Sequence, residues 1–567
     1  MERVIEPTMT HWPTRFARVA GASWIGLALA LALAPAAHAV YDPTREYVEV
    51  PAVAARYPDP AIEIATPAFA TGKTDFTNQG ELEAFVDDLS RRSRDLRVRI
   101  AGYSQEHRAI PLLVFAHPAA TSGGDVQKNG KPTVLIIGQQ HGNEPAGSEA
   151  ALALAAELSP SPRAGILDRV NVVIVPRANP DGAHHFVRGL KNGADVNRDH
   201  LLEGTPEGRA LGHVFVEYQP DVVLDCHEFG VKTRWFEKFG GLQRHDALIQ
   251  YATVSNLSPA LTEMAETMFR QPLIKELNAR GLTQSWYYAS SYDMNDKVVS
   301  MGGVVPDTGR NIAGLRNAVS FLIETRGVGI GRAHFKRRVQ THLIAMNSML
   351  DSAAANGPAL MALVRRLRAD VAAAAGVGEL VVAGSATLTR HTLELVDPET
   401  GADKSVEVDW RSALEMQVRQ KRSRPYGYLL PASEVEAATR LVHLGATVLR
   451  VQQDAHVDSE RYRITRMQES KKEDVRRNDD DGAANVVQIA TIVEPARLAV
   501  KVGDFYVPMD QPLANVIAAA LEPETQSSYA ANRVLMLPKV DAAQAAFLPL
   551  YRLPNALVAP AVVYEGN

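Results

Sequence analysis

Four residues of the chain have the types needed to hold and use a metal ion. His141 and Glu144 stand three positions apart in the stretch HGNE, and His227 lies much further along the chain. Two histidines and one glutamate are a ligand set of catalytic zinc, which keeps a fourth position open for water. Glu324 is not needed as a ligand, and a separate carboxylate of this kind can take a proton from the activated water. The pattern therefore indicates metal-assisted hydrolysis.

Each of the four residues follows an apolar run that predicts a buried strand. These runs are residues 133–137, 221–224 and 319–323. In sheets of parallel strands, ligands bind in the crevice beyond the carboxyl ends of the strands. We therefore expect the four side chains to follow directly on their strands and to meet at one edge of a sheet.

The remaining pattern up to residue 375 predicts an α/β fold. Helical spacing is found over residues 81–96 and 148–158, a hairpin over 97–115, and a further buried strand over 170–175. Strands that are apolar throughout and are separated by helices favour a doubly wound, mostly parallel or mixed sheet with helices on both faces.

The second part of the chain has a different pattern. After a helical stretch over 332–375, residues 379–396 and 404–410 alternate as strands do, 467–482 resembles a charged exposed loop, and 513–521 is predicted helical. A chain of 567 residues also exceeds what one hydrophobic core usually serves. We therefore expect a catalytic region over 40–375 and a β-rich region of unknown role over 376–567.

The N-terminus is typical of a signal peptide. Arg15 and Arg18 precede the apolar run 22–34, and the small-residue sequence Ala37-His38-Ala39 follows it. The alternative is a membrane anchor, but the run is shorter than the roughly 20 residues of a membrane span. We expect cleavage of residues 1–39 and a periplasmic or secreted protein without a stable membrane span.

Composition narrows the possible functions further. The formal net charge of −5 gives no sign of the basic surface that nucleic-acid binders usually carry, so we expect no nucleic-acid partner. The chain has one cysteine, Cys226, which cannot form an internal disulfide. Its place after an apolar run favours a small buried side chain over a nucleophile.

Together, these motifs resemble the M14 metallocarboxypeptidases, which have the carboxypeptidase A-like fold. The resemblance runs from about residue 81 to residue 331. It rests on the stretches GYSQEHRAIPLLVF, HGNEPAG, NPDG, NGADVNRD, DCHE and FLIETRG. The NPDG stretch is expected to form a tight turn.

The resemblance implies a role for each matching residue. His141, Glu144 and His227 match the ligands of one Zn²⁺ per chain, and Glu324 matches the general base, which also protonates the leaving amine. Three further residues match substrate-contacting positions: Asn197 and Arg198, which grip the terminal carboxylate, and Arg188, which polarises the scissile carbonyl. The implied partners are the C-termini of peptides or proteins.

Two positions depart from the family pattern. The tyrosine that closes over the substrate in the family has no counterpart at the usual place, where the chain reads Met301-Gly302-Gly303, and Tyr292 is the candidate instead. Arg310 occupies the region that shapes the specificity pocket. It either favours an acidic C-terminal side chain or has only a structural or surface role.

Three alternatives stay open on the sequence alone. An exported enzyme with the same zinc site can trim peptidoglycan stem peptides, and an acyl-amino-acid deacylase on the same fold would also need HxxE and a distal histidine. An inactive module that only captures C-termini is the alternative from another class, although all four residues needed for hydrolysis are present.

Overall fold

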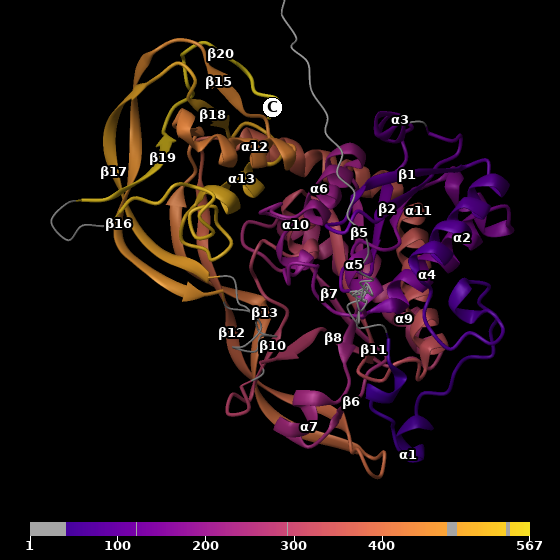
Figure 1. Ribbon diagram of the computed structural model, residues 1–567. Helices are drawn as coiled ribbons and strands as arrows, with labels where there is room; N and C mark the ends of the chain where they lie inside the picture. The colour runs from indigo at the N-terminus through magenta and orange to yellow at the C-terminus, as the bar shows by residue number, and fades with distance from the viewer. Residues whose placement is uncertain (1–40, 121, 292, 473–484, 540–544, 567) are drawn as a thin grey trace, which may run out of the picture. The chain divides into compact units, whose positions relative to one another are not determined.

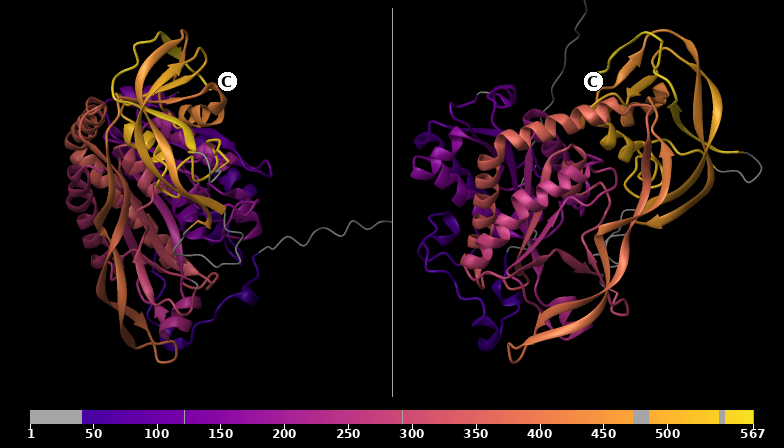
Figure 2. Two further views of the ribbon diagram at one scale, coloured as in Figure 1. Left: turned by 90° about the vertical axis from the view of Figure 1, so that its left-hand side faces the viewer. Right: turned by 180° about the vertical axis from the view of Figure 1, so that it is seen from behind.

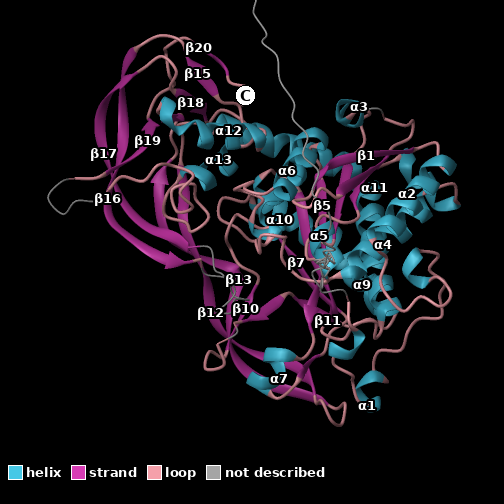
Figure 3. Ribbon diagram, in the orientation of Figure 1, coloured by secondary structure: helices cyan, strands magenta, loops and turns pink. Residues whose placement is uncertain are grey.

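An eight-stranded mixed sheet forms the centre of the first part of the chain in the computed structural model (Figures 1 and 3). The structure describes residues 41–120, 122–291, 293–472, 485–539 and 545–566, so the predicted signal peptide and Tyr292 lie outside the described residues. In spatial order the strands are β1 (Leu96–Tyr103), β2 (Ala109–Phe115), β4 (Asn171–Val175), β3 (Thr133–Gly138), β5 (Val222–Gly230), β11 (Val319–Val328), β7 (Ala247–Tyr251) and β8 (Gln284–Trp286).

The four central strands of this sheet, from β4 to β11, run parallel. The flanking strands β2 and β7 pair antiparallel with β4 and β11, β1 forms an antiparallel hairpin with β2, and β8 pairs parallel with β7. This arrangement confirms the predicted mixed α/β sheet with a parallel centre.

Helices cover both faces of the sheet because the side chains of its apolar strands alternate between two cores. Val134 and Ile136 lie in one core, whereas Leu135 and Ile137 lie in the other. The first core is covered by α2 (Gln79–Arg92), α4 (Pro145–Leu158), α8 (Pro259–Met264), α9 (Gln271–Ala279) and α11 (Phe335–Ala373). Figure 2 shows the long helix α11 on this side. The second core lies under α3 (Gly123–Lys128) and α6 (Pro206–Tyr218).

A smaller sheet of five strands joins the two parts of the chain. Its spatial order is β6 (Leu242–Gln243), β12 (Glu379–Val396), β13 (Asp403–Ser423), β10 (Val298–Met301) and β9 (Tyr288–Ser290). The long ribbon β12–β13 therefore pairs on both sides with strands that precede residue 376. The helix α7 (Thr233–Phe239) contributes Trp235 and Phe239 to the core beneath this sheet.

The rest of the chain is β-rich, as predicted. Seven antiparallel strands form the third sheet, in the order β17 (Asn485–Val500), β16 (Ala455–Lys471), β19 (Phe547–Leu553), β14 (Gly427–Leu430), β18 (Phe505–Pro508), β15 (Leu449–Val451) and β20 (Ala561–Val563). The helices α12 (Val435–His443) and α13 (Ala514–Leu521) share its core.

The charged loop predicted over residues 467–482 is wrong for residues 467–471, and residues 473–482 lie outside the described residues. Residues 467–471 were expected in a charged loop, but they continue β16 and pair with β17, Met467 opposite Ile489 and Lys471 opposite Asn485. The backbone of residues 467–471 is paired with β17 in a two-stranded extension of the sheet. The charged side chains stay exposed there, so they do not interfere with this pairing. Within the described ranges, no helix is both long enough and apolar enough to cross a membrane.

Candidate metal centre and substrate cavity

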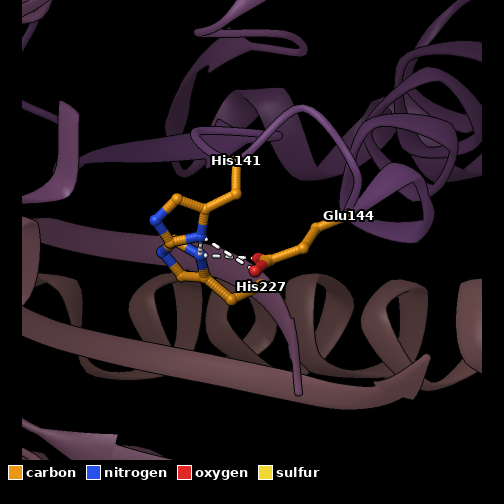
Figure 4. Close-up of side chains that lie close together, drawn as sticks. All are labelled: His141, Glu144 and His227. Carbon is orange, nitrogen blue, oxygen red and sulfur yellow. Dashed lines mark hydrogen bonds and ion pairs between the residues drawn. The ribbon is translucent and has the colours of Figure 1, made fainter. Parts of the chain in front are cut away.

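The side chains of His141, Glu144 and His227 converge on one point (Figure 4). His141 Nδ1 lies 2.9 Å from Glu144 Oε1, and His227 Nδ1 lies 3.0 Å from both Glu144 Oε2 and His141 Nδ1. All three residues are buried. Tetrahedral zinc with metal–nitrogen distances of about 2.0–2.1 Å separates its ligand atoms by roughly 3.3 Å. The donor set and its spacing therefore fit a single metal ion.

The loop between β3 and α4 brings two of these ligands together. His141 follows β3, and Glu144 is the residue immediately before α4, where Pro145 fixes the first helical position. At Gly142 the loop passes so close to the next turn that a Cβ would lie 1.8 Å from the backbone carbon of Gly182. The HxxE loop can approach this turn only because residue 142 has no side chain.

The turn that meets this loop is the NPDG stretch, which begins the short helix α5 (Pro180–His185). Asn179 caps it by accepting a hydrogen bond from the Gly182 N–H at 2.7 Å. The same side chain donates to the Gly189 carbonyl at 3.1 Å. The NPDG stretch, predicted to be structural, therefore supports the HxxE loop.

His227 and Glu324 lie within strands, which corrects the expectation that they follow strand ends. β5 continues to Gly230 and β11 to Val328, and the two residues are direct partners in the parallel register. Hydrogen bonding continues past the apolar runs because β11 is paired on both sides, with β5 and with β7. The candidate base is therefore held beside a ligand by the ladder itself.

Two aspartates that the sequence interpretation missed hold the outer nitrogens of the histidines. Asp195 Oδ1 lies 3.1 Å from His141 Nε2, and Asp225 Oδ1 lies 2.8 Å from His227 Nε2. A carboxylate at Nε2 orients the ring so that Nδ1 faces the metal position. The available signal was spacing: Asp225 stands two residues before His227 on the same strand, and therefore on the same face.

The charges around the centre shift several pKa values. Burial lowers the pKa of His227, but the carboxylates of Asp225 and Glu144 outweigh it and raise the pKa to about 10. Burial raises the pKa of Glu144 and of Asp195, but the neighbouring cationic groups, His141 for Glu144 and Arg188 for Asp195, hold both well below their usual range.

The predicted substrate-contacting residues lie around this centre. Arg188 NH1 is 3.1 Å from His141 Nδ1, and its NH2 donates to Asp195 Oδ2 at 2.7 Å. Asn197 is buried, with its Nδ2 at 3.0 Å from His227 Nε2 and its Oδ1 accepting from the Gly309 N–H at 2.8 Å. Arg198 NH1 donates to the Asn197 carbonyl at 2.7 Å. The structure therefore brings all three to the metal centre.

A cavity of about 1100 Å³ opens beside these residues. Its lining includes His141, Arg188, Asn197, Arg198, Glu324, Arg310 and Tyr287. Arg310 is buried, and its NH2 donates to the Gly303 carbonyl at 2.8 Å. Tyr288, in contrast, lies in the core against Trp235 and Trp410. Of the tyrosines at positions 287 and 288, it is Tyr287 that faces the substrate space.

The two residues next to His227 in the sequence, Cys226 and Glu228, are buried and have structural roles. Cys226 is buried in the core that α4 and α11 cover, and burial raises the pKa of its thiol well above the usual value. It is therefore not an activated nucleophile. Glu228 pairs with Arg338 at 2.8 Å and accepts a hydrogen bond from the Ala146 N–H at 2.9 Å. It ties β5 to the first turn of α4.

Known proteins with similar sequences are carboxypeptidases. Residues 82–291 match the model of the zinc carboxypeptidase family, Peptidase_M14. Carboxypeptidase 2 of Trichophyton equinum is 26% identical over 490 residues, which cover 86% of this chain and 88% of that protein. Carboxypeptidase 2 of Trichophyton rubrum is also 26% identical, with the same coverage.

Among solved structures, carboxypeptidase A of Helicoverpa armigera matches with a TM-score of 0.37 and 14% identity, covering 50% of this chain and 74% of that one. A metallo-carboxypeptidase of Pseudomonas aeruginosa matches with a TM-score of 0.35 and 19% identity, covering 48% and 69%.

Proposed function

We propose that this chain, a metallocarboxypeptidase similar to the M14 zinc carboxypeptidases, removes C-terminal residues from peptides or proteins with Glu324 as the general base. The observation that carries this proposal is the register of β5 and β11. It places Glu324 directly opposite His227, and both Glu324 and His141 line one cavity.

In this proposal His141, Glu144 and His227 hold one Zn²⁺ per chain. When bound, the ion supplies a Lewis acid and lowers the pKa of water at its open position. Glu324 takes a proton from the attacking water and delivers it to the departing amine. Because Glu324 is carried by a strand paired on both sides, the position of its backbone is fixed beside the ligand His227.

The substrate's terminal carboxylate binds Asn197 and Arg198, and Arg188 stabilises the charge that develops on the scissile carbonyl. Arg310 favours an acidic side chain on the terminal residue, which its buried guanidinium at the cavity wall supports. Tyr292 is the sequence-based candidate for the residue that closes over the substrate.

We also propose that the protein is exported and that residues 1–39 are removed. N-terminal sequencing of the protein from its producing cell tests this, and a mature chain that starts at Val40 is the expected result.

The activity is tested with two peptides that differ only in a free or amidated C-terminus. The free peptide should be cut with release of one amino acid, and amidation should lower kcat/KM sharply because Arg198 loses its anionic partner. Equal cleavage of both would indicate an endopeptidase or amidase. Purified muropeptides in the same assay test the peptidoglycan alternative, and binding without hydrolysis would indicate a module that only captures C-termini.

A further inference from the structure

The segment after residue 375 supplies one wall of the substrate cavity. The cavity that contains Glu324 is also lined by residues 380–386 of β12, by Arg411 and Arg419 of β13 and by Arg466 of β16. Residues 487–490 of β17 and parts of α13 complete this wall. A peptide in the cavity therefore meets side chains that are distant in sequence from the metal centre.

Specific contacts fix this wall against the catalytic part. Asn256 and Val381 exchange two hydrogen bonds of 3.0 Å each, and Asn515 Nδ2 donates to the Asn256 carbonyl at 3.0 Å. Asp307 is fully buried and forms an ion pair of 2.6 Å with Lys472. Because Asp307 stands three residues before Arg310, the wall is tied directly to the specificity region.

The carboxylates along the same wall are already neutralised. Glu522 pairs with Arg422 at 2.8 Å and accepts a hydrogen bond from the Tyr428 hydroxyl at 2.7 Å. Glu524 pairs with the same Arg422. Arg552 Nε also lies 3.4 Å from Glu522, so two arginines face these two carboxylates, and the acidic groups add little negative field to the cavity.

Three arginines of the wall are not neutralised in this way. Arg411, Arg419 and Arg466 are exposed, and no carboxylate of the described residues forms an ion pair with them. Arg419 donates to the Ser385 hydroxyl at 2.8 Å and Arg466 to the Gln468 side-chain carbonyl at 2.6 Å, both neutral groups. The wall thus presents uncompensated positive charge to the cavity.

Depth in the cavity indicates which part of a peptide would meet this charge. Glu324 and Arg310 are buried at the inner end, whereas the three arginines are exposed at its outer side. A peptide that places its C-terminal residue at the inner end must extend its remaining chain outward. The arginines therefore flank the residues on the N-terminal side of the scissile bond.

We propose that this wall of Arg411, Arg419 and Arg466 selects peptides with acidic side chains N-terminal to the scissile bond. The inference rests on the proposed carboxypeptidase function and adds a substrate class to it. Long guanidinium side chains suit carboxylate recognition, and opposite charge also speeds the encounter of substrate and enzyme.

The test compares kcat/KM for two peptides with the same C-terminal residue, one with glutamates and one with glutamines at the next three positions. At low ionic strength we expect the glutamate peptide to be preferred at least fivefold, about 1 kcal/mol. Salt should reduce this preference, because the arginines are exposed and therefore screened.

The triple variant R411Q/R419Q/R466Q should lose most of the preference, so that its kcat/KM for the glutamate peptide falls towards its kcat/KM for the glutamine peptide. Arg390→Gln is the matched control, because Arg390 is an exposed arginine of the same ribbon that pairs with Asp409 at 2.6 Å and does not line the cavity. Equal kcat/KM for both peptides in the wild type, or an unchanged preference in the triple variant, would overturn the proposal.

A loss of the charge preference and a loss of carboxypeptidase activity give different results. If neither peptide is hydrolysed, the proposed function fails, and fluorescence anisotropy of both labelled peptides with the Glu324→Gln protein still measures the charge preference. A fivefold tighter binding of the glutamate peptide supports the wall, and equal binding refutes it.

Discussion

Gly142→Ala offers a direct test of how the metal centre is held. An added Cβ would lie 1.8 Å from the backbone carbon of Gly182 and 2.2 Å from both the Gly182 oxygen and the Ala183 nitrogen. All three atoms belong to the backbone, so no side chain can rotate away. The backbone at Gly142 is not among the left-handed glycines, so the cost comes from contact and not from φ.

The required displacement can be compared with what a metal site tolerates. Favourable contacts between carbon atoms lie at about 3.5–4.0 Å, so the loop and the turn must separate by roughly 1.7–2.2 Å. Metal–ligand distances tolerate only about 0.2 Å. Because His141 and Glu144 flank the substituted residue, we expect at least tenfold weaker zinc binding, together with about 1–3 kcal/mol of overpacking cost.

Chelator competition measures the zinc affinity, and denaturant unfolding of the metal-free protein measures the packing cost. Gly165→Ala is the control, because nothing lies within 4 Å of its Cβ position, and it should change stability by less than about 0.5 kcal/mol. A Gly142→Ala protein with zinc affinity within threefold of the wild type would show that the loop does not depend on this close contact.

Three further outcomes are expected. Glu324→Gln should keep its zinc but lose about 10²–10⁴ in kcat, and a rate within tenfold of the wild type would assign the base elsewhere. Lys472→Met should destabilise the protein by about 3–5 kcal/mol in denaturant unfolding, because it leaves Asp307 buried without a cation, whereas the exposed Lys421→Met should cost under about 1 kcal/mol. Burial raises the pKa of Glu203 to about 8, so the contribution of this residue to stability is present below about pH 4.5 and is lost as pH rises through 8. Glu203→Gln should therefore flatten the fall in Tm over this range. An unchanged dependence of Tm on pH would contradict the assignment.

The sequence predicted the central sheet well because its strands have strong local signals. The apolar runs before HGNE and before Glu324 became β3 and β11, and the helix after HGNE became α4. What failed was the position of strand ends at His227 and Glu324. Polar residues usually end a buried strand, but here the backbone at both residues is paired with neighbouring strands, so the ladder continues through them.

The supporting aspartates were harder to find for a different reason. Asp195 and Asp225 are two of 65 acidic residues, and nothing local distinguishes Asp195 from the others. The role of Asp195 depends on its contact with His141, which lies 54 residues earlier in the chain. For Asp225 the strand period would have placed it on the face of His227, so this signal was present but unused.

The place of the C-terminal segment depends on strand pairing that no local pattern encodes. Alternation indicates which residues of β13 share a face, but it does not identify β10 as the neighbouring strand, with Val298 opposite Asp409. Once that pairing is known, the ribbon β12–β13 lies along the cavity that Glu324 also lines. It follows that substitutions at Arg411 or Arg419 should change which peptides are cut, although neither residue is near the metal ligands in sequence. If these residues form a wall of the cavity, such substitutions change peptide selectivity and leave metal binding unchanged. A passive structural support would not change selectivity in this way.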